Sequence, residues 1–126
     1  FTRNLLPEEI FDQVVAVKRL GEERGLPLSN IVLMGMGEPL LNYENVLAAI
    51  ERITAEDGLG MSPYRLTLST SGIVGGIKRL ADDDVRFNLA ISLHSAVNTT
   101  RFPNWPKPSG ISWIKQAPVP RSNTCY

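Results

Sequence analysis

A glutamate between a glycine and a proline is the first residue of the sequence whose position suggests chemistry. Glu38 follows the apolar run 31–34 and belongs to the stretch GMGEP, residues 35–39. Glycines let a ligand approach the backbone closely, and a proline ends a strand because it lacks a backbone donor. A carboxylate displayed in this way suits a cationic ammonium group. The same glutamate could cap a helix or pair with a lysine, and the residues alone leave these roles open.

Two further polar groups come at the ends of apolar runs. The letters STSG, which begin with Ser69, follow one run, and Ser92, Leu93 and His94 end the next. Hydroxyl groups suit a ribose or a carboxylate, and His94 is the chain's single histidine. Simpler interpretations stand beside these. Ser, Thr and Gly are common in turns, and a histidine at a strand end is more often a hydrogen-bonded structural residue than a catalyst.

The elements that must position these residues alternate along the chain. Helical spacing of apolar residues predicts helices over 7–24, 43–55 and 73–82, and short apolar runs predict strands over 30–34, 65–70 and 87–93. This alternation predicts an α/β fold of parallel βαβ units with right-handed crossovers. Ligands bind beyond the carboxyl ends of parallel strands, so the polar groups are expected on one rim.

Local signals set the ends of the helices. Pro7 suits the first helical position and Gly25 is a natural stop. Asn42 is expected to cap the helix over 43–55. The first helix should bury one apolar stripe, formed by Ile10, Phe11, Val14 and Val17.

Composition narrows the classes of function. The 126 residues suit one domain or part of one, and thirteen Lys and Arg balance thirteen Asp and Glu. This balance does not indicate a strongly basic surface, and no apolar stretch is long enough to span a bilayer, so no membrane association is expected. Cys125 alone cannot form an internal disulfide or a metal site, which fits a cytoplasmic protein. A phosphate-binding protein is disfavoured because no phosphate loop is present.

The C-terminal residues 102–126 differ in character from residues 1–101. They hold five of the nine prolines and both tryptophans. They show neither a helical stripe nor a convincing strand pattern, so an irregular tail is expected after a domain over 1–101.

Three segments, taken in order, closely resemble one family. MGMGEPLLNYENVLAAI, LTLSTSGIVGGIKRLA and LAISLHSAVNTTR resemble the RlmN/Cfr family of radical S-adenosylmethionine (SAM) enzymes. These enzymes methylate adenine in ribosomal RNA and, in the RlmN branch, also in transfer RNA. The resemblance covers about residues 1–101 and implies the central part of a radical SAM core domain. It implies a partial (β/α) barrel with about three parallel strands and helices.

The resemblance also implies a site. Gly37 and Glu38 match the GEP-like motif that ends the second barrel strand and holds the SAM amino group. Ser69 matches the family's serine at the third strand end. Ser92, Leu93 and His94 match its SLH contacts. SAM is therefore the implied cofactor, and 23S rRNA and tRNA are the implied substrates. Carbon 2 of adenine is the default target, and the choice between carbon 2 and carbon 8 is left open.

The chain departs from the family in its cysteines. The family binds a [4Fe–4S] cluster through a C-x-x-x-C-x-x-C loop and uses two more cysteines in methyl transfer. Cys125 is the only cysteine, and its neighbours do not match those of the methyl-carrying residue. No catalytic residue or metal site is therefore assigned, and the chain is expected to bind no cluster. FTRNL, residues 1–5, resembles the segment that follows the cluster loop.

This start predicts a piece of a longer protein, and the loss of the family pattern after Arg101 predicts a truncated or frame-shifted product. The alternative function is a catalytically inactive fragment or a non-catalytic βαβ binding module. A sheet of three strands leaves two open edges, and open edges invite association. The isolated chain is therefore expected to be marginally stable or oligomeric.

Overall fold

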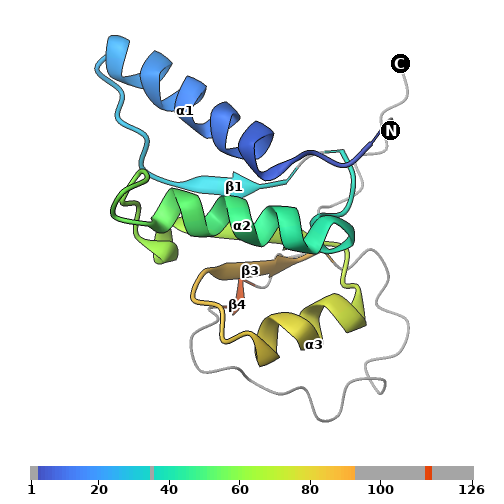
Figure 1. Cartoon of the computed structure of the whole chain (residues 1–126). Helices are drawn as coiled ribbons and strands as arrows, with labels where there is room; N and C mark the ends of the chain where they lie inside the picture. Colours follow the sequence, from blue (N-terminus) through green and yellow to red (C-terminus); the bar gives the residue numbers. More distant parts are fainter. Residues whose placement is uncertain (1–2, 35, 93–112, 115–126) are drawn as a thin grey trace, which may run out of the picture.

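The computed structural model describes residues 3–34, 36–92 and 113–114, in which helices alternate with parallel strands (Figure 1). The helices are α1 (Pro7–Glu23), α2 (Tyr43–Thr54) and α3 (Val74–Asp82). The strands are β1 (Ile31–Leu33), β2 (Leu66–Thr70), β3 (Asn88–Ile91) and β4 (Trp113–Ile114). Two short 3-10 helices, η1 (Pro39–Asn42) and η2 (Pro63–Arg65), precede α2 and β2. The predicted α/β alternation is confirmed.

The strands form one parallel sheet in the order β1-β2-β3-β4. Leu33 lies opposite Leu68, and Leu68 lies opposite Leu89, so these leucines share one face of the sheet. Ser69 and Ala90 are partners on the other face. Because the strands are parallel, the carboxyl ends of β1, β2 and β3 lie along one edge, as the alternation of elements predicts.

The helices cover the leucine-bearing face and form one core with it (Figure 1). Leu66, Leu68 and Leu89 are fully buried there. Apolar side chains of all three helices complete this core: Ile10, Val14, Val46, Ala49, Ile50, Ile53, Ile77 and Leu80. Burial of one such aliphatic side chain stabilises a fold by about 1.5–3 kcal/mol. On the opposite face Val32 is 52% exposed, so the described residues leave that part of the sheet open.

Helix α1 departs from the predicted stripe at its C-terminal half. Ile10 and Val14 are buried and Phe11 packs against the core, but Val17 is 56% exposed. Figure 1 shows α1 crossing α2 obliquely, and Val15, Lys18 and Gly21 are half-buried in place of Val17. The crossing angle depends on both helices, so the stripe of α1 alone does not fix where its burial ends.

Asn42 departs from its predicted role as the side-chain cap of α2. It occupies the N-cap position, but its side chain makes no capping hydrogen bond. Instead its amide donates to the Leu5 carbonyl at 2.9 Å, because the segment ahead of α1 brings that acceptor within reach.

The tail contains a strand that the sequence pattern does not predict. Trp113 and Ile114 form β4, with Leu89 opposite Trp113 and Ala90 opposite Ile114. A two-residue strand needs no alternating pattern of its own, since its backbone groups pair with the open edge of β3. The rest of 102–126 lies outside the described residues, as do Leu93, His94 and Cys125. In the described ranges, none of the helices has the length and apolar character needed to cross a membrane.

Candidate functional site

The carboxylate of Glu38 accepts four hydrogen bonds at the end of β1. Its Oε1 accepts from the Leu40 backbone N–H at 3.1 Å and from the Thr70 hydroxyl at 2.7 Å. Its Oε2 accepts from the backbone N–H and the hydroxyl of Ser71, at 2.8 and 2.7 Å. We call these four donors the Glu38 cradle. The cradle joins the carboxyl end of β1 to that of β2.

The local sequence turns Glu38 toward β2. Gly37 has a φ of 110°, a backbone conformation that strains other residues. Glu38 is extended and serves as the N-cap of η1, whose first residue is Pro39. Because Pro39 has no N–H, Leu40 supplies the first backbone donor, and Glu38 accepts from it. The helix-capping alternative for Glu38 is therefore correct.

The donors around Glu38 stabilise its charge without cancelling it. Partial burial acts to raise the pKa of Glu38, but the hydrogen bonds from Ser71, Thr70 and Leu40 outweigh burial and hold the pKa below its ordinary value. All four donors are neutral groups. None of the ion pairs found among the described residues includes Glu38. Within that part of the chain, the rim thus presents an ionised carboxylate that has no cationic partner.

Thr70 fixes one side of the cradle. It is 2% exposed, and its hydroxyl donates to Glu38 while accepting from the Gly72 N–H at 3.1 Å. Gly72 has a φ of 101°, so the chain turns sharply just after β2. The Ser92 N–H donates to the Thr70 carbonyl at 2.9 Å, which extends the pairing of β2 and β3 to the rim.

The structure brings four predicted site residues to this rim, and two of them lie apart from the cradle. Gly37, Glu38, Ser69 and Ser92 all lie at the carboxyl ends of β1, β2 and β3. Ser69 is half-buried on the open face of the sheet, because side chains alternate along β2 and Thr70 points to the core. Leu93 and His94 lie outside the described residues.

Sequence reasoning missed the partners of Glu38. Thr70 and Ser71 belong to the STSG stretch, for which turn chemistry was the simpler interpretation. Both hydroxyls instead bind the carboxylate, and only Thr70 also takes part in the turn. The available signal was two consecutive hydroxyl residues at the end of the strand that neighbours the glutamate, one the last residue of β2 and one directly after it.

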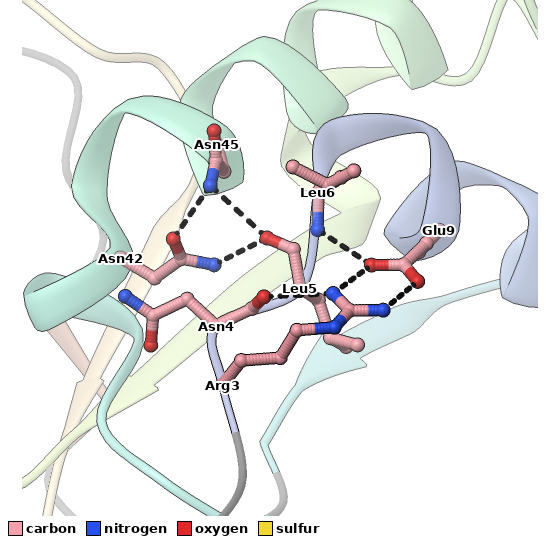
Figure 2. A network of polar contacts seen from close by, with 7 residues as sticks. All are labelled: Arg3, Asn4, Leu5, Leu6, Glu9, Asn42 and Asn45. Carbon is pink, nitrogen blue, oxygen red and sulfur yellow. Dashed lines mark hydrogen bonds and ion pairs between the residues drawn. The ribbon is translucent and has the colours of Figure 1, made fainter.

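A second carboxylate lies in a network ahead of α1 (Figure 2). The Arg3 guanidinium donates to both oxygens of Glu9, at 2.7 and 2.5 Å. The Leu6 N–H also donates to Glu9, at 2.8 Å. These hydrogen bonds, with that from Arg3 the largest cause, lower the pKa of Glu9 to about 2. Here the charge of the carboxylate is neutralised by an arginine.

The same segment is tied to α2 through a single carbonyl. The Leu5 carbonyl accepts from the Asn42 amide and also from the Asn45 amide, at 2.9 and 3.1 Å (Figure 2). Asn45 also donates to Asn42 Oδ1 at 2.8 Å. We call residues 3–6, with Glu9, Asn42 and Asn45, the N-terminal strap. Since Asn42 ends η1 and Glu38 precedes it, the strap holds the far end of the turn that carries Glu38.

A third polar group links α2 to the end of α3. The Tyr43 hydroxyl donates to Asp83 at 2.5 Å, and burial together with this hydrogen bond raises the pKa of Tyr43. Arg79 lies 4.2 Å from the centre of the Tyr43 ring and forms an ion pair with Glu44. Arg79 and Glu44 neutralise each other between α3 and α2, and Asp83 accepts from Tyr43 of α2, so the arrangement indicates a structural link.

The chain is similar in sequence and in structure to known proteins. No protein-family model matches the chain. It is 62% identical over 102 residues to the probable dual-specificity RNA methyltransferase RlmN of Flavobacterium johnsoniae, a match of 79% of this chain and 29% of that protein. The protein of the same name from Christiangramia forsetii is 61% identical over 102 residues, with 79% and 28% covered. The chain thus spans less than a third of the length of these curated relatives.

A solved structure gives the same likeness in three dimensions. The crystal structure of a radical SAM methyltransferase from Sphaerobacter thermophilus superposes with a TM-score of 0.72 and is 45% identical in sequence. The match covers 75% of this chain and 28% of that one.

Proposed function

Because this chain belongs to the RlmN family of radical SAM methyltransferases, of whose length it spans less than a third, we propose that it supplies one edge of the SAM site in an RNA-methylating enzyme. The observation that carries this proposal is the ionised Glu38, whose hydrogen-bond donors among the described residues are all neutral. We assign residues 1–101 to the corresponding part of the core domain, a partial (β/α) barrel of the radical SAM type.

SAM fits the rim by the chemistry of its groups. Its ammonium matches the negative charge of Glu38, and charge-assisted hydrogen bonds of this kind are among the stronger ones. Gly37 is exposed beside Glu38, which leaves its backbone open to a ligand. Ser69 and Ser92 suit the ribose or the carboxylate of SAM, and we assign Leu93 and His94 to the same cofactor. When bound, SAM supplies the methyl group and the radical chemistry of the family.

An iron–sulfur cluster does not fit the residues of this chain. A [4Fe–4S] cluster is held by cysteine thiolates, and the sequence has Cys125 alone. Among the described residues, no group of three His, Cys, Asp or Glu side chains could hold a metal ion. We therefore assign SAM binding to this chain and no step that depends on the cluster.

For the complete enzyme, we propose methylation of carbon 2 of adenine in 23S rRNA and tRNA, in the cytoplasm. The relatives' name, dual-specificity RNA methyltransferase, supports an RNA substrate. A non-catalytic βαβ module is the competing function, and it predicts that SAM does not bind.

Calorimetric titration of SAM into the chain tests the site. A hydrogen bond to a charged group contributes about 1.5–3 kcal/mol, so Glu38→Ala should weaken SAM binding roughly ten- to a hundredfold. Glu22→Ala is the matched control, because it removes an exposed carboxylate of α1 that pairs with Lys18 and lies outside the N-terminal strap and the Glu38 cradle. Equal affinities for Glu38→Ala and the unmodified chain would refute the assignment.

A chimaera tests the activity. Residues 3–92 of this chain would replace the matched segment of the Flavobacterium johnsoniae relative, and methylation of RNA would be measured. We expect an active chimaera that Glu38→Ala inactivates. A folded but inactive chimaera would favour the inactive fragment instead.

A further inference from the structure

The Glu38 cradle leaves no acceptor position of the carboxylate free. An ionised carboxylate offers about four lone-pair positions. In this structure Oε1 accepts from Leu40 and Thr70, and Oε2 accepts twice from Ser71. A ligand ammonium can therefore hydrogen-bond to Glu38 only where one of these four donors withdraws.

Three of the donors are fixed by the fold. The Leu40 N–H belongs to η1, and the Ser71 N–H belongs to the backbone of the turn after β2. The Thr70 hydroxyl is buried and also accepts from the Gly72 N–H. Its withdrawal would leave a buried hydroxyl without an acceptor, which is costly.

The fourth donor, the Ser71 hydroxyl, differs from the others because it can rotate away from Glu38. Ser71 is exposed, and rotation about one side-chain torsion moves its hydroxyl from Glu38 into water. The released hydroxyl can then bond to solvent, and the Ser71 N–H still holds Oε2 in place.

We propose that the Ser71 hydroxyl is an exchangeable donor, which holds Glu38 in the absence of ligand and rotates away when a ligand ammonium takes its position. Thr70 is the matching positioning residue, which stays bound in both states. The inference rests on the proposed function only in naming SAM as the ligand. It makes Ser71 a competitor of the ligand rather than a contact.

The exchange predicts that loss of the Ser71 hydroxyl strengthens SAM binding, whereas a structural role predicts that it weakens binding. Ser71→Ala removes the competing donor and leaves the backbone N–H in place, so affinity for SAM should rise about two- to tenfold, the equivalent of one ordinary hydrogen bond. Thr70→Val keeps the shape of the side chain but removes the fixed donor, so affinity should fall. If Ser71 only supported the fold or contacted the ligand, its loss would weaken binding.

The experiment uses the 126-residue chain, calorimetry with SAM, and NMR. The scalar couplings of Ser71 report its side-chain torsion, and the carboxyl carbon of Glu38 reports its hydrogen bonding. We expect SAM to change both signals together and Ser71→Ala to tighten binding. Weaker binding by Ser71→Ala, or a Ser71 torsion unchanged at saturating SAM, would overturn the exchange while leaving the SAM site intact.

Methylammonium serves as a second probe, because it carries the cation alone. If SAM does not bind at all, the proposed function fails, and the exchange is then decided by methylammonium. A shift of the Glu38 carboxyl signal with rotation of Ser71 would support the exchange. Neither change at high methylammonium concentration would overturn it.

Discussion

Glu9 and Glu38 each accept several hydrogen bonds, and each has a pKa below its ordinary value, but the donors around them differ in charge. Glu9 accepts from the cationic Arg3 and from one backbone N–H, on the surface of the N-terminal strap. Glu38 accepts from two backbone N–H groups and two hydroxyls, in a half-buried position at the strand ends.

The difference separates a carboxylate whose charge is neutralised from one whose charge is kept. Arg3 stabilises the charge of Glu9 by neutralising it, so little attraction remains for another cation. Neutral donors stabilise the charge of Glu38 and leave it in place. A low pKa alone therefore does not identify a binding site, and the charge of the donors must be counted as well.

The largest effect on stability is expected below the Glu38 cradle, where α3 approaches η1. A Cβ atom at Gly76 would lie 2.8 Å from Leu40 Cβ, whereas a Cβ at Gly75 would meet nothing within 4 Å. Gly76→Ala should therefore destabilise the fold by about 1–3 kcal/mol through overpacking. Gly75→Ala should stabilise it by about 0.5–1 kcal/mol, because alanine favours the helix. Urea unfolding measures both, and equal effects at the two positions would show that η1 is not packed tightly on α3.

Substitutions in the N-terminal strap should change the free energy of unfolding less than Gly76→Ala does, because the Asn42 and Asn45 amides share one acceptor. Asn42→Ala or Asn45→Ala alone leaves the Leu5 carbonyl with one donor. Each single variant also breaks the hydrogen bond from Asn45 to Asn42 Oδ1, which the double variant loses only once. The double variant should therefore lose about 0.5–1.5 kcal/mol less than the sum of the single losses. A double-mutant cycle by urea unfolding measures this coupling. Strict additivity would mean that the two hydrogen bonds act independently.

The smallest effect is expected from the charge of Arg3. The pKa of Glu9, about 2, lies below its ordinary 4.5, so Glu9 stabilises the fold above pH 4.5 and this contribution is lost as the pH falls toward 2. Arg3→Gln should raise the pKa of Glu9 toward 4.5 and reduce that contribution. The pKa of Glu38 should not move. NMR titration of the carboxyl carbons reads both groups in one experiment.

The salt dependence of the two pKa values tests the difference between Glu9 and Glu38. Added salt screens exposed ion pairs, so it should raise the pKa of Glu9 more than that of Glu38. If the pKa of Glu38 rose as steeply with salt, a cation would be acting on it, and the contrast between the two carboxylates would fail.

The sequence by itself determined the elements and the turn that carries the site. The helix predicted over 43–55 is Tyr43–Thr54, and the strand predicted over 65–70 is Leu66–Thr70. These predictions succeeded because helical spacing, short apolar runs, and Gly37 and Pro39 on either side of Glu38 all act over a few residues. The exposure of Val17 was not predictable in this way, since it depends on how α1 crosses α2.

Only the tertiary structure decided what Glu38 binds. Its partners Thr70 and Ser71 come 32 and 33 residues later, and no local pattern links them to it. The register of the parallel strands links them to Glu38. Leu33 lies opposite Leu68, and this alignment places the end of β2 beside the turn after β1. β4 arose in the same way, through pairing with an edge of β3 that its own two residues do not specify. Hydrogen bonds between distant segments depend on how strands align, and alignment is set by the packing of the whole sheet against its helices.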